Sequence, residues 1–189
     1  MGYSIELYFD EGFESRVTEL WKRLEAFDVP SIMQTIGSKP HISLAVLDSV
    51  DEEDVSGILE IFASRLPPFE VDFPAYGLIP GPTHTVFLAP IVNAALIDVQ
   101  KALYQQLQSF GFQPRTCYEP GHWLPHCTVS KELSPSDALK TVGICQDNFL
   151  TGSARAIELG FIEFRPRREI KTVSLISTTS PPAAKLLPI

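Results

Sequence analysis

The chain has 189 residues, and its 15 Lys and Arg against 23 Asp and Glu give a net charge of −8. Its 44% hydrophobic and 20% charged residues are typical of a globular domain and exclude collagen, a coiled coil and a mostly disordered chain. The acidic balance argues against a protein that coats long nucleic acid, and no apolar run approaches the ~18–20 residues of a membrane span.

The first part of the chain alternates strand and helix patterns. Hydrophobic residues recur at helical spacing after the first strand, and Ser49 with Glu52 forms a capping box before the second helix. The expected elements are a strand at 3–9, a helix at 11–27, a strand at 40–47, a helix at 50–65 and a strand at 69–79.

The second part of the chain follows the same order. Asn93 can cap a helix that Gly111 ends, and Ser134-Pro135 opens another. A closing strand at 170–177 pairs antiparallel with the strand before it, and segment 180–189 is expected to be a loose tail. The other expected elements are a strand at 84–89, a helix at 93–110, a strand at 125–131, a helix at 135–147 and a strand at 154–164.

A fixed offset relates the two parts of the chain. It equals 85 residues at three places: Pro40 to Pro125, His41 to His126 and Ser49 to Ser134. We interpret it as the duplication of a β-α-β-α-β unit, with repeat halves at about 1–80 and 81–165 inside one bilobal domain at 1–179. Each half alone would bury only a thin core, so we expect the halves to share a face and to leave a cleft between them.

The repeated position holds polar residues that suit phosphate chemistry. Residues i and i+2 of a strand face the same side, so His41 shares a face with Ser43. Likewise, His126 shares a face with Thr128 and Ser130. Two imidazoles can act as acid and base near neutral pH, and two hydroxyls can donate hydrogen bonds to phosphoryl oxygens. The opposite faces, expected in the core, carry Ile42, Leu44, Val46, Cys127 and Val129.

The stretches KPHISLAVL and LPHCTVSKEL resemble the paired His-x-Thr/Ser motifs of the 2H phosphoesterase superfamily. That superfamily includes RNA 2′,3′-cyclic phosphodiesterases and 2′-5′ RNA ligase-like proteins, and this chain is most similar to the branch that joins 2′-5′ RNA ligases with cyclic nucleotide phosphodiesterases. The resemblance covers nearly the whole chain. It implies an α+β fold of two pseudo-symmetric lobes, each an antiparallel sheet with two helices, around a central cleft. It also implies that His41 and His126 are the catalytic pair and that Ser43 and Thr128 bind the phosphate.

Three residues in the loop before the second motif have two interpretations each. Tyr118 and Trp123 either pack the loop or form a platform on which a nucleobase stacks. Arg115 either is solvated or contacts phosphate.

The basic residues near the end of the chain are also open to two interpretations. They sit in the turn and second strand of the closing hairpin, which is either a solvated hairpin or a loop that faces phosphate. These residues are Arg165, Arg167, Arg168 and Lys171.

Metal and thiol chemistry are not expected. His122 and His126 are four residues apart, but Pro120 and Pro125 flank them, so a helical metal-binding pair is disfavoured. The strand alternation turns Cys127 away from its neighbouring histidine, which disfavours Cys-His catalysis.

The predicted function is a phosphodiesterase that needs no metal or other cofactor. It opens 2′,3′-cyclic phosphates of small cyclic nucleotides or RNA ends by paired-histidine acid/base catalysis, and the resemblance adds 2′-5′ RNA ligase activity. The alternative is a module that binds an RNA end or a nucleotide in the same cleft without turnover; a structural protein with buried histidines is the weaker third. Three widely spaced cysteines and an N-terminus without a signal-peptide pattern favour the cytoplasm, with the nucleus left open. We expect a monomer.

Overall fold

Eight strands and five α-helices lie within residues 2–147 and 151–176, the part of the chain that the computed structural model describes. The predicted tail at 180–189 lies outside these residues. In chain order the elements are β1 (Gly2–Phe9), α1 (Glu11–Ala26), α2 (Ile32–Thr35), β2 (His41–Leu47), α3 (Glu52–Ala63), β3 (Phe69–Phe73), β4 (Ala75–Ile79), β5 (His84–Ala89), α4 (Ala94–Ser109), the 3₁₀ turn η1 (Thr116–Tyr118), β6 (Cys127–Leu133), α5 (Pro135–Asp147), β7 (Gly152–Phe164) and β8 (Arg168–Ser174).

Two of the predicted caps are confirmed and one is wrong. The Asn93 side chain accepts from Leu96 N at 3.0 Å, and Ser134 Oγ accepts from Asp137 N at 3.1 Å. The cap of α3, however, is Asp51 rather than Ser49, because the Asp51 carboxylate accepts the backbone N–H groups of the first turn. An aspartate at this position caps as well as a serine and also suits the positive end of the helix.

Three elements differ from the sequence patterns. The strand expected at 69–79 is two strands, since Pro74 lacks an N–H and interrupts the ladder: β3 pairs with β7, whereas β4 pairs with β5. The short helix α2 lies in a stretch expected to be loop. The closing strand β8 ends at Ser174, earlier than the predicted 177.

All strand pairs are antiparallel, in the order β3-β7-β1-β2-β6-β5-β4, and β8 also pairs with β7. The α+β class with a large antiparallel sheet is therefore confirmed. At the middle of this order, β2 and β6 are joined by the single pair Ile42↔Cys127. Because only this pair joins β2 to β6, the strands on its two sides, β3-β7-β1-β2 and β6-β5-β4, can separate from each other away from the junction.

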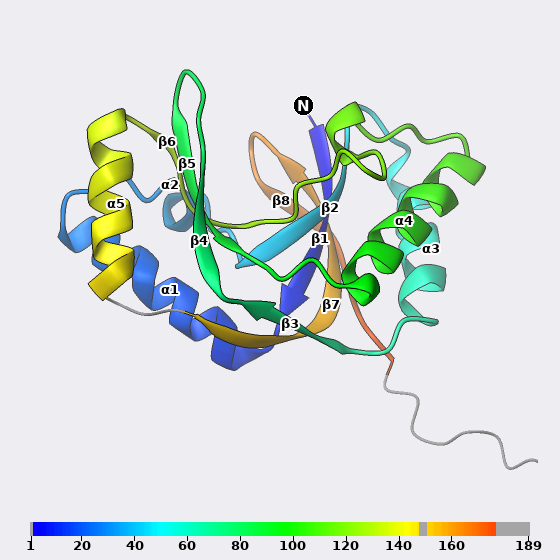
Figure 1. Cartoon of the computed structure of the whole chain (residues 1–189). Helices are drawn as coiled ribbons and strands as arrows, with labels where there is room; N and C mark the ends of the chain where they lie inside the picture. Colours follow the sequence, from blue (N-terminus) through cyan, green and yellow to red (C-terminus); the bar gives the residue numbers. More distant parts are fainter. Residues whose placement is uncertain (1, 148–150, 177–189) are drawn as a thin grey trace, which may run out of the picture.

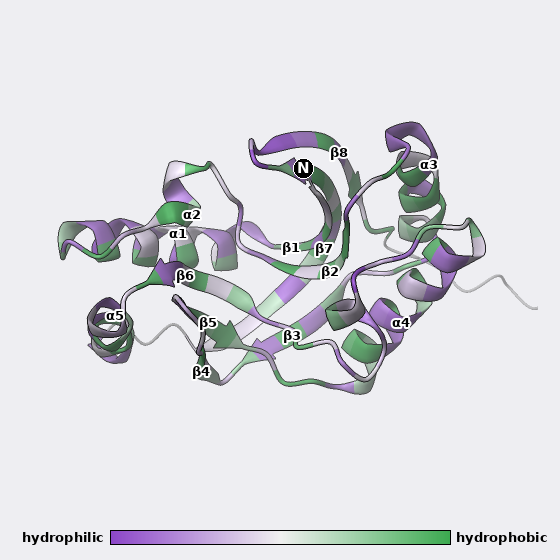
Figure 2. Cartoon of the chain, turned by 90° about the horizontal axis from the view of Figure 1, so that it is seen from above, coloured by the Kyte–Doolittle hydropathy of each residue, from purple (hydrophilic) through white to green (hydrophobic). Residues whose placement is uncertain are grey.

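The helices gather in two groups on opposite sides of the strands (Figure 1). Helices α3 and α4 pack together and contact β2, β7 and β8. In the other group, α1 contacts both α2 and α5, and the three helices contact β4, β5, β6 and β7. Figure 2 shows the same separation from above. Each group thus combines helices from both predicted repeat halves. The division of the chain at about residue 80, and the duplication itself, stay predictions.

The core lies between these helices and the sheet. Its largest fully buried side chains include Phe13 and Trp21 of α1 and Phe73 of β3. Phe13 and Phe73 stack with ring centroids 4.7 Å apart, and Phe9 meets both rings edge-on. Such packing fixes the strands that carry the polar residues of the cleft.

Candidate active site

The two motif histidines lie on either side of the narrow junction between β2 and β6. Ile42 and Cys127, the paired residues of this junction, are fully buried. Because side chains alternate along a strand, the preceding residues His41 and His126 face the opposite way, and both line one cleft. The structure thus brings together two histidines that are 85 positions apart in the sequence.

Both imidazoles are held by the same type of hydrogen bond. His41 Nδ1 lies 2.7 Å from the carbonyl oxygen of Lys39, and His126 Nδ1 lies 2.8 Å from that of Leu124. A carbonyl can only accept, so each Nδ1 carries a hydrogen. This leaves Nε2 of each ring as the atom available to a substrate.

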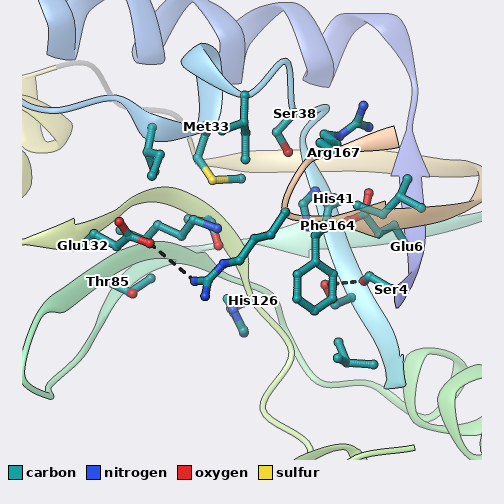
Figure 3. A pocket seen from close by; sticks show the side chains of 18 of the residues that line it. Ser4, Glu6, Met33, Ser38, His41, Thr85, His126, Glu132, Phe164 and Arg167 are labelled. Atoms are coloured by element: carbon teal, nitrogen blue, oxygen red, sulfur yellow. Dashed lines mark hydrogen bonds and ion pairs between the residues drawn. The ribbon is translucent and has the colours of Figure 1, made fainter. Parts of the chain in front are cut away.

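The two motif hydroxyls line the same cleft. Ser43 and Thr128 are both half-buried and belong to its walls. Ser4 Oγ donates to Ser43 Oγ at 3.3 Å, which orients that hydroxyl (Figure 3). The Trp123 indole Nε1 donates to the backbone oxygen of Ser43 at 3.0 Å, which holds the strand itself.

Each motif strand contains a β-bulge directly after its hydroxyl residue. Beyond the bulge, some side chains lie on the opposite face from the one that the sequence alternation predicted. In β2 the pairing skips Leu44, so Val46 lies on the cleft face and not on the core face predicted for it. In β6 the pairing skips Val129, and Ser130 leaves the face that it was predicted to share with His126. Ser130 is fully buried, and its hydroxyl donates to the backbone oxygen of Pro30 at 2.7 Å.

The cleft has a volume of about 460 Å³, within the ~300–1,000 Å³ of small-molecule sites. His41, Glu6 and Arg167 lie on one side, and His126, Thr85 and Glu132 lie on the other (Figure 3). Sequence reasoning missed Glu6, which is the only charged residue in residues 2–9. A lone carboxylate in an otherwise apolar strand pattern was the signal that could have found it.

The structure distinguishes among the three loop residues that had two interpretations each. Tyr118 and Arg115 line the cleft. Trp123 packs against the core and braces Ser43, and it is absent from the described residues that line the cleft, which favours its packing role. Arg115 donates to Asp48 Oδ1 from Nε at 2.9 Å and from Nη2 at 2.5 Å, so its charge is already partnered. Burial raises the pKa of the Tyr118 phenol to about 12, which keeps it neutral.

The basic hairpin between β7 and β8 divides into two parts. Arg165 and Arg167, in the turn, line the cleft; the Arg165 guanidinium lies 3.8 Å from Glu132 across the cleft (Figure 3). Arg168 instead binds Glu52 and Glu163, and Lys171 pairs with Glu60, so both are engaged away from the cleft. Only the turn therefore remains a candidate for contact with phosphate.

Two groups beside the junction have shifted pKa values. Burial lowers the pKa of His126, and the charge of His41 lowers it further, while the hydrogen bond to the Leu124 carbonyl opposes this shift. Burial raises the pKa of the Cys127 thiol to about 12. Cys127 is fully buried on the core face, as predicted, and is not a nucleophile.

The remaining histidines lie apart from this pair. The His122 side chain is 72% exposed and faces Glu119 at 3.7 Å, and His84 opens β5. In the described residues, no group of three or more His, Cys, Asp or Glu side chains is arranged to hold a metal ion. No helix within this same part of the chain combines the length and apolar composition needed to cross a membrane.

Two imidazoles and two hydroxyls are presented by neighbouring antiparallel strands of an α+β fold to one cleft, which is the arrangement that the resemblance to 2H phosphoesterases implies. A profile of the 2′-5′ RNA ligase superfamily matches residues 13–167, and the chain belongs to that superfamily. A search of curated proteins found no match.

Solved structures share the fold at low sequence identity. The protein TT0787 of Thermus thermophilus aligns with a TM-score of 0.60 and 14% identity over 95% of this chain and 100% of its own. Escherichia coli LigT, in apo form, aligns with a TM-score of 0.58 and 15% identity over 92% of this chain and 96% of its own. LigT in complex with 3′-AMP aligns with the same TM-score and identity, over 92% and 97%.

Proposed function

We propose that this protein is a metal-independent phosphodiesterase that opens the 2′,3′-cyclic phosphate of a nucleotide or an RNA end. The observation that carries the proposal is the matched placement of the histidines. His41 and His126 are both fixed through Nδ1 and both line one cleft with Ser43 and Thr128. Superfamily membership supports phosphoesterase-type activity on nucleotides or RNA.

The proposed reaction needs one base and one acid at the same time. A neutral imidazole takes a proton from water as the water oxygen attacks phosphorus. The bond from phosphorus to one ribose oxygen breaks, and the protonated imidazole gives its proton to that oxygen. Ser43 and Thr128 donate hydrogen bonds to the non-bridging oxygens, where negative charge accumulates. The family resemblance favours a 2′-phosphate product, in which the 3′-oxygen leaves. Attack by the 5′-hydroxyl of a second RNA in place of water, with the same bond broken, would join RNA ends through a 2′-5′ bond.

The size and the charge of the cleft support a substrate of nucleotide size. Its volume of about 460 Å³ suits a mononucleotide or the last residue of an RNA. LigT, which shares the fold, is described in complexes with 3′-AMP, NADP+ and ATP. We assign Arg165 and Arg167 of the hairpin turn as contacts to the substrate phosphates, because both line the cleft while the rest of the chain is acidic.

A direct test is turnover of defined cyclic phosphates. The four nucleoside 2′,3′-cyclic monophosphates and a short RNA that ends in a 2′,3′-cyclic phosphate would each be incubated with the purified chain. Anion-exchange chromatography and ³¹P NMR then separate the 2′-phosphate from the 3′-phosphate product. We expect opening of the ring by the parent and its loss in His126→Ala. His122→Ala is the matched control, because it removes an exposed imidazole outside the cleft.

The second candidate function is binding without turnover, in the same cleft. Charged Arg and Lys serve phosphate binding better than two imidazoles that titrate near neutral pH, which favours the enzyme. If the parent leaves all these substrates intact but binds a nucleoside monophosphate, and if His126→Ala weakens that binding, the protein is a binding module and the proposal of an enzyme is wrong.

A further inference from the structure

The two histidines occupy matched positions, but their neighbours on the adjacent strand differ. In the β1–β2 pair, Leu7 faces Ile42 and Glu6 faces Ser43 before the bulge. In the β5–β6 pair, Leu88 faces Cys127, and Phe87 faces Thr128 before a bulge at the same place. Glu6 and Phe87 are therefore counterparts in strand register.

These counterparts give the imidazoles opposite surroundings. Glu6 Oε1 lies 3.3 Å from His41 Nε2, and the Glu6 side chain is only 3% exposed. At the matched place, the Phe87 ring meets the His126 ring edge-on, with centroids 5.5 Å apart. One imidazole has a buried carboxylate beside it, and the other has an aromatic ring.

The contacts of each ring indicate which nitrogens of His41 and of His126 carry a hydrogen. His41 Nδ1 already carries a hydrogen for the Lys39 carbonyl, so a favourable contact between Nε2 and an ionised carboxylate requires a second hydrogen on the ring. Among the described residues, no carboxylate forms an ion pair with His126, so its Nε2 keeps a lone pair.

From this asymmetry we infer that Glu6 divides the roles of the pair: it holds His41 as the general acid and leaves His126 as the general base. The inference rests on the proposed function. In the proposed reaction, water gives its proton to His126 Nε2 and attacks phosphorus. The ribose oxygen on the opposite side leaves with the proton of His41 Nε2. The ribose therefore lies on the His41 side of the cleft, because attacking and leaving oxygens are roughly in line.

The contact leaves His41 able to act as an acid. Its 3.3 Å separation is longer than the ~2.7–2.9 Å of a charge-assisted hydrogen bond. At this separation, the hydrogen on Nε2 can be shared between the carboxylate and a substrate oxygen that enters the cleft. The lowered pKa of His126, caused first by its burial, agrees with a base that is neutral near pH 7.

Glu6 is itself fixed in place by a buried phenol. Tyr8 Oη donates to Glu6 Oε2 at 2.8 Å, and burial keeps the Tyr8 pKa far above its usual range, so Tyr8 donates and does not compete as an anion. The Tyr8 ring covers Gly160 of β7, where any side chain would collide with it. Arg167 Nη2 reaches Tyr8 Oη at 3.5 Å. Within the described residues, the charged and titratable groups facing this network include Glu6, Tyr8, Lys39, His41, Tyr118, His126, Arg167 and Glu169.

The test separates charge from structure with three variants. Glu6→Gln removes the carboxylate charge and keeps the shape of the side chain. Tyr8→Phe removes the hydrogen bond but leaves the charge. Glu70→Gln is the matched control, since Glu70 is an exposed carboxylate on β3. Circular dichroism and urea unfolding identify any variant that fails to fold.

NMR of the four imidazoles, assigned by single substitutions, measures protonation without turnover. We expect His41 to keep its second proton to a higher pH than His126 in the parent and in Glu70→Gln. In Glu6→Gln, His41 should lose that proton at least about 1 pH unit earlier. Tyr8→Phe, which keeps the carboxylate but frees it from the phenol, should shift the His41 titration less than Glu6→Gln does. A reversed order in the parent, or an unchanged His41 titration in Glu6→Gln, overturns the assignment.

Kinetics on a 2′,3′-cyclic nucleotide adds the second measurement. The rate falls at high pH as the general acid loses its proton, and this fall is the alkaline limb of the pH–rate profile. Glu6→Gln should shift that limb to lower pH while the limb at acidic pH stays in place. A rate that falls equally at every pH would reduce Glu6 to a structural residue. A parent that shows the expected protonation order but opens no cyclic phosphate would overturn the proposed function alone.

Discussion

Removing one or both of the paired histidines is the sharpest perturbation of the proposed mechanism. General acid or base catalysis contributes about 10²–10⁴-fold, so His41→Ala and His126→Ala should each lose that factor, about 2.7–5.5 kcal/mol of transition-state stabilisation. The losses should not multiply in the double variant. Both rings line one cleft, and the charge of one changes the pKa of the other, so they act as a unit.

The pH dependence follows from the state that each ring needs. The base must be neutral, so the rate falls as pH drops through the pKa of His126, which burial places below its usual ~6.5. The acid must be protonated, so the rate falls again at higher pH. The parent profile should be bell-shaped, with two values that belong to the coupled pair.

The assay is a set of pH–rate profiles on a 2′,3′-cyclic nucleotide for the parent, the two single variants, the double variant and His122→Ala. Each single variant should lose one limb of the bell, and His122→Ala should match the parent. An active parent whose single variants keep the full rate and both limbs would refute paired-histidine catalysis.

Four further outcomes follow from the same contacts. Ser43→Ala and Thr128→Ala should each lower the rate by roughly 10- to 150-fold, since a hydrogen bond to a charged oxygen is worth about 1.5–3 kcal/mol; parent-like rates in both would remove the hydroxyls from the phosphate site. Activity should survive EDTA, because histidines make both proton transfers, and a loss that a divalent ion reverses would count against the mechanism. Trp123→Phe should lower the free energy of unfolding by about 0.5–1.5 kcal/mol in urea, through loss of the bond to the Ser43 carbonyl, without altering base preference as a stacking platform would. The lowered folded pKa of His126 adds stability above pH ~6.5 that is lost as pH falls through that pKa, so His126→Gln should flatten the acid side of the stability curve in urea titrations.

The sequence was informative where local rules decide the structure. Alternation placed His41 and Ser43 on one face of β2 with Ile42 buried behind them, and the structure agrees. Side-chain caps such as Asn93 depend on neighbouring residues alone, which is why they could be read without a fold. The 85-residue spacing also predicted a long-range feature, because it related two strands, β2 and β6, that are distant in the sequence and adjacent in the sheet.

Long-range pairing decided what the sequence could not show. The bulges that turn Val46 toward the cleft and Ser130 away from it arise from how β2 and β6 pair with their partners. The bracing role of Trp123 also needs a contact across 80 positions, since its indole meets the Ser43 backbone. Glu6 carried a signal in the sequence, but its partner His41 became visible only once β1 and β2 were paired.

The proposed reaction makes unequal demands on two similar motifs. Opening a cyclic phosphate requires one ring that accepts a proton and one that gives a proton, yet both motifs present a histidine fixed through Nδ1 to a carbonyl two residues earlier. A difference must therefore come from outside the motifs. The neighbouring strand supplies it, with Glu6 beside His41 and Phe87 beside His126. A carboxylate and an aromatic ring at matched positions are a sufficient physical cause for two like groups to take opposite roles.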